Sequence, residues 1–68
     1  MSEYQVISTE PHTYMEKGNG VINGVLIRFR IPAYDEIHEV RIPKMDTAMA
    51  KKAIEKLVSD RDALAELG

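Results

Sequence analysis

The stretch from Val25 to Ile42 reads VLIRFRIPAYDEIHEVRI and decides the fold. Apolar and polar residues alternate on both sides of the Pro-Ala-Tyr-Asp segment at 32–35. Such alternation is typical of two half-buried strands joined by a turn. Because successive side chains of a strand point to opposite faces, the stretch predicts a β-hairpin with one apolar face.

The register of this hairpin follows from its apolar face and its charges. Pairing Ile27 with Val40 joins the two apolar faces and sets Arg28 opposite Glu39 on the other face. A shift by two residues keeps the faces but opposes Arg28 and Arg41. Cross-strand pairs contribute only about 0.2–1 kcal/mol each, and they select among registers that the apolar face already permits. We expect the register that pairs Arg28 with Glu39.

Two Asn-Gly pairs precede this hairpin, at Asn19-Gly20 and Asn23-Gly24. Asn-Gly favours a type I′ hairpin turn, because both central residues of that turn need a positive φ. A turn at Asn23-Gly24 would place Gly18 and Gly20 inside a strand, where each glycine is unfavourable by about 0.5–1 kcal/mol. We therefore expect the turn at Asn19-Gly20, with Gly24 as a bulge or a site of close backbone approach.

This first turn also predicts which side chains reach the apolar face. It sets Tyr14 opposite Val25 and His12 opposite Ile27, so that both rings share the face of the main hairpin. Pro11 cannot donate to a strand ladder and is expected at an edge, a bulge or a turn.

The last third of the chain predicts a helix. Asp46 is the expected N-cap, with Thr47 as the alternative, and Gly68 is a natural terminator. The polar residues 59–62 interrupt the apolar stripe. The helix either continues, with Arg61 lying along the edge of the stripe, or breaks near Ser59, and we favour one helix. The stripe consists of Ala50, Ala53, Ile54, Leu57, Val58, Leu64 and Leu67.

Together these elements predict one small α+β domain over residues 1–68. Its fold class is a three-stranded antiparallel β-meander with one C-terminal α-helix packed on one face (β-β-β-α). The sequence leaves open whether residues 1–10 are ordered. The expected core consists of Tyr14, Val25, Ile27, Phe29, Val40, Ile42, Ile54, Leu57 and Val58.

Composition limits how such a domain is stabilised. The chain has 68 residues, no cysteine and a net charge of −2. It is near the size at which one core gives marginal stability, and it has no disulfide framework. A dimer is one route to more buried surface, and idealised packing of the helix on the sheet within a monomer is the other. Because no apolar run is long enough for a signal peptide or a membrane span, we expect a cytoplasmic protein without membrane contact.

Few residues indicate chemistry. The three serines lie outside any Gly-x-Ser-x-Gly motif, and Lys17-Gly18-Asn19-Gly20 does not have the spacing of a phosphate loop. His12 and His38 are expected on the apolar face, with no close-spaced carboxylate motif to complete a metal site. We therefore expect no enzymatic activity, no metal site and no cofactor.

The face opposite the core offers the best candidate for a function. It mixes arginines with apolar residues, a combination that protein interfaces favour. A solvated sheet face explains the charges alone, but not the apolar residues among them. We expect a binding protein that contacts a protein partner or a second copy of itself, as a homodimer, through Leu26, Arg28, Arg30, Ile37 and Arg41.

Nucleic-acid binding is the alternative function for the same face. A sheet that carries arginines can lie in a groove of DNA and contact phosphates or guanine edges. The net negative charge argues against a dedicated nucleic-acid binder. The residues expected to make such contacts are Lys17, Arg28, Arg30, Arg41 and Lys44.

In outline, a three-stranded sheet followed by a helix that begins with threonine resembles the arm-type DNA-binding domains of tyrosine recombinases. Val40-Arg41-Ile42, Asp46-Thr47 and the stretch Ala50–Ala53 carry this resemblance, which covers about half of the chain. It implies a sheet that contacts DNA, and it is a likeness of fold.

Overall fold

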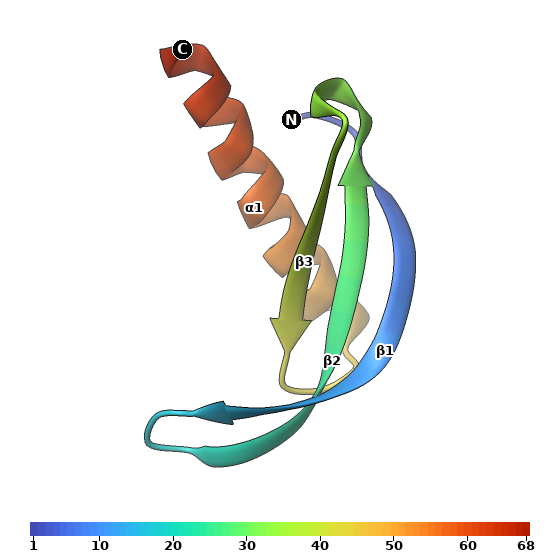
Figure 1. The fold of residues 1–68 in the computed structure, drawn as a ribbon, viewed down its shortest axis with the longest axis vertical. Helices are drawn as coiled ribbons and strands as arrows, with labels where there is room; N and C mark the ends of the chain where they lie inside the picture. Colours follow the sequence, from blue (N-terminus) through green and yellow to red (C-terminus); the bar gives the residue numbers. More distant parts are fainter.

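The computed structural model describes all 68 residues and has the expected order of elements (Figure 1). Three antiparallel strands form an open sheet in the order β1-β2-β3, and one helix follows, which confirms the β-β-β-α fold. The elements are β1 (Gln5–Glu16), β2 (Gly20–Ile31), a 3-10 turn (Pro32–Tyr34), β3 (Glu36–Ile42) and α1 (Thr47–Leu67).

The hairpin formed by β2 and β3 has the predicted register. Ile27 lies opposite Val40, and Arg28 lies opposite Glu39. The connection closes through Asp35, whose backbone N–H donates to the carbonyl of Pro32 at 3.1 Å. Asp35 has a φ of 51°, a left-handed conformation that aspartate tolerates better than most residues.

The predicted register of β1 and β2 was wrong by three residues. Tyr14 lies opposite Ile22, and the loop contains three residues, Lys17 to Asn19, between the paired Glu16 and Gly20. The positive φ angles fall on Gly18 and Gly20 instead of on Asn19. The Asn19 side chain instead donates to the Glu16 carboxylate at 2.7 Å. Two glycines that flank an asparagine thus favour a three-residue loop over a type I′ turn.

This shift moves two rings to the other side of the sheet. Because three is an odd number, every side chain of β1 from Ser8 to Glu16 changes face relative to the prediction. Tyr14 and His12 lie opposite Ile22 and Gly24, on the face that carries Arg28. The prediction of Tyr14 in the core and of His12 on the apolar face was therefore wrong, whereas His38 does lie opposite Phe29.

Strand β1 is continuous, and its one irregularity in pairing lies at neither Pro11 nor Gly24, the two positions at which a bulge was considered. It passes through Pro11, which an edge strand tolerates. The register shift lies between Val6 and Ser8, and Gly24 is not a bulge. Gly24 is instead a site of close approach, because a Cβ atom there would collide with the carbonyl of Ile42 and lie 2.9 Å from the Tyr14 ring.

The core lies between α1 and the odd-numbered side chains of β2. Tyr4 packs edge-on against Phe29, with ring centroids 6.2 Å apart, so the N-terminal segment belongs to the fold. The buried apolar residues are Ile27, Phe29, Ile31, Ile42, Ala50, Ile54 and Val58. Of the other expected core residues, Val25, Val40 and Leu57 are partly buried against this cluster.

Helix α1 is a single helix with the expected N-cap. The carboxylate of Asp46 accepts a hydrogen bond from the backbone N–H of Met49 at 3.1 Å. The helix continues through Ser59 without a break. It covers one side of the sheet, while the tip of the β1–β2 hairpin extends beyond the end of β3 (Figure 1).

Asp46→Ala tests the cap. Loss of the carboxylate leaves a backbone N–H of the first turn without its partner, so we expect the free energy of unfolding to fall by about 0.5–2 kcal/mol. Chemical denaturation monitored by circular dichroism measures this. Thr47→Ala is the control and should have the smaller effect; the reverse order would assign the cap to Thr47.

Gly24→Ala tests the close approach of three strands. The added methyl group meets a backbone carbonyl that cannot move away without disturbing the end of β3. We expect a loss of about 1–3 kcal/mol, the usual cost of overpacking. Asn23→Ala, at the exposed neighbouring position, should cost less than half as much. Equal midpoints for both variants in thermal unfolding would contradict the packing described here.

Candidate interaction surface

The five residues predicted to bind a partner lie on the face of the sheet that points away from α1, here called the outer face. Leu26 lies opposite Arg41, and Arg30 lies opposite Ile37, with the pair of Arg28 and Glu39 between them. Ile37 is 61% exposed, while Leu26 is half-buried. The row of Arg28 separates these two apolar side chains. The outer face therefore alternates charged and apolar groups and has no continuous apolar patch.

Two of the arginines already have acidic partners within the chain. Arg28 donates to Glu39 at 3.1 Å, and Arg30 donates to Asp35 at 2.6 Å. Such solvent-exposed pairs contribute little to stability. They do compensate the positive charge of the face.

Arg41 lies in a cluster that the sequence did not predict. Its guanidinium lies 4.9 Å from the centroid of the Tyr14 ring, and His12 stacks on that ring at 5.7 Å. A cation–π contact at an exposed site is worth about 0.5–1 kcal/mol. The three-residue shift of β1 forms this cluster, because it turns both rings toward Arg41.

The two lysines expected beside the arginines are not gathered with them. Lys17 lies in the loop at the tip of the β1–β2 hairpin, and Lys44 lies between β3 and α1. Both are exposed, and neither forms an ion pair. The basic residues of the chain therefore do not form one patch.

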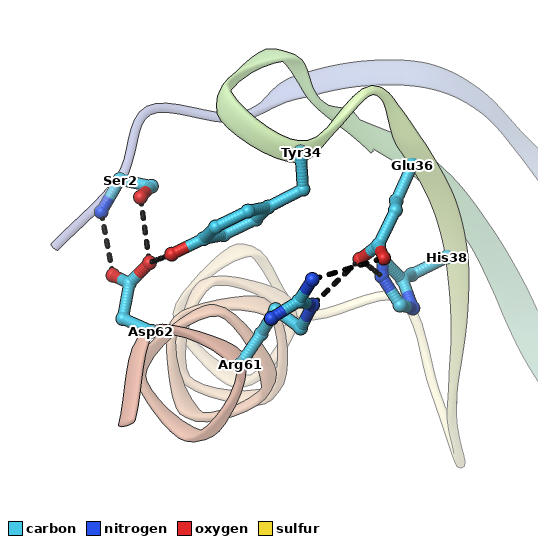
Figure 2. A network of polar contacts seen from close by, with 6 residues as sticks. All are labelled: Ser2, Tyr34, Glu36, His38, Arg61 and Asp62. Carbon is cyan, nitrogen blue, oxygen red and sulfur yellow. Dashed lines mark hydrogen bonds and ion pairs between the residues drawn. The ribbon is translucent and has the colours of Figure 1, made fainter. Parts of the chain in front are cut away.

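A polar network joins α1 to the rest of the fold at the other end of the sheet (Figure 2). Arg61 donates to the two oxygens of Glu36 from Nε at 2.8 Å and from Nη2 at 3.2 Å. The same carboxylate lies 2.9 Å from His38 Nε2. Arg61, which interrupts the apolar stripe of the helix, thus fixes α1 to β3.

The second half of this network anchors the N-terminal segment. The carboxylate of Asp62 accepts from the backbone N–H of Ser2 at 2.8 Å and from its hydroxyl at 2.6 Å. Tyr34 also donates its hydroxyl to Asp62. The guanidinium of Arg61 lies 4.1 Å from the centroid of the Tyr34 ring and links the two halves.

These contacts hold both carboxylates in the ionised form. The hydrogen bonds from Arg61 and then from His38 lower the pKa of Glu36 to about 2. Those from Ser2 and Tyr34 lower the pKa of Asp62 to about 2. The bond to Asp62 raises the pKa of Tyr34, and the bond to Glu36 raises the pKa of Arg61. Both carboxylates of the network thus have their hydrogen-bond donors within the chain. The network joins three segments, namely the N-terminal segment, the part of the chain from Tyr34 to His38, and α1.

No cluster in the structure has the composition of a metal centre. No group of three or more His, Cys, Asp or Glu side chains lies close enough together to hold an ion. His38 has one carboxylate beside it, and His12 lies on the other face of the sheet.

The sequence also did not predict an apolar groove on the side of the sheet that faces α1. Its volume is about 330 Å³, and it lies between β1 and the first turns of the helix. It forms because a single helix does not cover all three strands. Apolar side chains line most of it, namely those of Tyr4, Val6, Ile27, Met45, Ala50 and Ile54, and Lys51 lies at its rim.

The network predicts that stability falls in acid. The pKa values of Glu36 and Asp62 in the folded protein lie below their ordinary values of 4.5 and 3.8. Their contribution is therefore complete above the ordinary pKa and is lost as the pH falls through about 2. We expect the midpoint of thermal unfolding to drop between about pH 5 and pH 2.

Amide variants test this assignment. Glu36→Gln and Asp62→Asn should each flatten the acid dependence and lower the midpoint at neutral pH. Glu10→Gln removes a carboxyl that makes no hydrogen bond and should keep the parent's dependence. A parent whose midpoint does not change from pH 5 to pH 2 would show that the network does not stabilise the fold.

Comparison with known proteins adds no function to this description. No family model, no curated protein and no solved structure matches the chain. The single helix, α1, does not contain the long apolar stretch that a membrane-spanning helix needs.

Proposed function

We propose that this chain is a small non-enzymatic interaction protein that pairs with a second copy of itself through the outer face. The observation that carries the proposal is the position of Ile37, which is 61% exposed among arginines whose charges are already compensated. Arginine and large apolar residues are enriched at protein interfaces.

The charges of the outer face suit a partner with the same face. A two-fold contact uses the same patch on both copies, so the patch must be self-complementary. The face carries Arg28 beside Glu39 and Arg30 beside Asp35, so both signs occur in neighbouring rows. A second copy can therefore place its carboxylates against these arginines without leaving a like charge opposite.

The size of the core also favours association. Only seven apolar residues are buried, in a chain of 68 residues without cysteine. A domain of this size buries a smaller share of its surface than a larger one does, and oligomerisation is one of the usual ways to add buried area.

Binding to nucleic acid through the same arginines is the second candidate. The ion pairs of Arg28 and Arg30 weigh against it, because a phosphate would have to displace Glu39 and Asp35. Affinity for DNA or RNA that falls steeply with salt would favour this candidate, since each phosphate contact releases counterions.

Ile37→Glu tests the pairing of outer faces. Sedimentation velocity over a range of protein concentrations should show that the parent self-associates, and the variant should associate at least tenfold more weakly, a loss of about 1.4 kcal/mol. The new carboxylate would have to be buried in the contact, and burying a charge without a partner is costly. The circular dichroism spectrum should not change, because Ile37 lies outside the core.

Met15→Glu is the matched control. It adds the same charge at an exposed apolar position in β1, opposite Val21 and away from the outer face. It should dimerise like the parent. A parent that stays monomeric at millimolar concentration would reject self-association, and an equal effect of both variants would reject the outer face as the contact.

A further inference from the structure

The last turns of α1 carry apolar side chains that nothing in the chain covers. Leu64 is 61% exposed and Leu67 is 86% exposed. The C-terminal end of α1 projects past the turn that joins β2 and β3 (Figure 1). Leu64 follows the partly buried Leu57 by seven residues, and Leu67 follows three residues later, so the two leucines continue the edge of the apolar stripe that carries Leu57.

The second feature is the apolar groove, which could receive apolar side chains of this kind. It lies at the opposite end of α1, where Ala50 and Ile54 form its floor with Ile27. Two exposed side chains at its mouth are Val6 and Met45. The groove is therefore open to solvent on this side.

The two features cannot meet within one chain. A helix rises about 1.5 Å per residue, so Leu64 lies about 15 Å further along the rigid helix α1 than Ile54, the groove residue nearest to it in the chain. An occupant that this sequence itself supplies must come from another copy.

The charges at the end of α1 and at the rim of the groove are also complementary. Glu66, between the two leucines, forms no ion pair and lies in the last turn, where the helix dipole disfavours a negative charge. Lys51 at the groove rim has only a 4.0 Å contact with Glu55. The groove also adjoins the positive, N-terminal end of α1. An acidic helix end is thus matched to a basic rim.

We infer that the C-terminal end of α1, Leu64 to Leu67, docks in the apolar groove of a second copy, with Glu66 beside the partner's Lys51. The contact joins two different patches, so it is heterologous and produces a ring or an open chain of copies. It does not use the outer face and is independent of the pairing proposed there.

The test uses the Ile37→Glu variant as its background protein, because this substitution weakens association through the outer face. One variant adds Leu64→Glu and Leu67→Glu to disable the helix end. The other adds Val6→Glu and Met45→Glu to disable the groove. All four positions are more than half exposed, so both variants should keep the circular dichroism spectrum of the background.

Sedimentation velocity should show that the background protein associates and that each variant alone is at least tenfold weaker. An equimolar mixture of the two should form a heterodimer, because one retains its groove and the other its helix end. A mixture that stays monomeric, or variants that associate like the background, would overturn the inference, as would a background protein that is monomeric at millimolar concentration.

Charge reversal checks the ionic part of the contact. Lys51→Glu and Glu66→Lys should each weaken association of the background protein severalfold. The double variant K51E/E66K should restore it, since every groove then meets an oppositely charged helix end. Weakening that persists in the double variant would show that these two residues do not face each other.

Discussion

The fold depends on the burial of one set of alternate side chains of β2 beneath a single helix. Ile27, Phe29 and Ile31 are almost completely buried, and α1 contributes Ala50, Ile54 and Val58 to the same cluster. Because strand side chains alternate, this burial directs Leu26, Arg28 and Arg30 to the outer face. It also leaves the groove beside β1 uncovered, since one helix cannot cover three strands.

The sequence predicted the register of the second hairpin and not that of the first, for a physical reason. In the β2–β3 hairpin, the apolar pattern and the Arg28–Glu39 pair both select the same register. In the β1–β2 hairpin, only turn chemistry selects it, because β1 is an exposed edge strand with little apolar pattern. Gly18 and Gly20 take the positive φ angles and lengthen the loop by one residue, which no pairing energy upstream opposes.

The candidate sites were predictable to the extent that strand alternation defines them. Arg28, Arg30 and Ile37 lie on one face because of their positions in the strands, and alternation predicts this directly. The network of Glu36, Arg61 and Asp62 depends on how α1 lies over the sheet, and its single signal in the sequence was an arginine that interrupts the apolar stripe. No feature of the sequence indicated the groove, because it forms where one helix is too narrow to cover three strands.

The order of charges along α1 fits a helix whose ends meet other molecules. An isolated helix is stabilised by acids near its start and bases near its end, and beyond its Asp46 N-cap α1 has neither an acidic residue in its first turn nor a basic one in its last. Its two internal pairs, Lys51–Glu55 and Lys56–Asp60, also run in the weaker order, with the lysine on the N-terminal side. Such an arrangement costs the monomer a little stability. A contact that brings the acidic end of one helix to the start of another reverses that cost, and it would couple assembly to folding, because the groove it fills is formed by residues of the core.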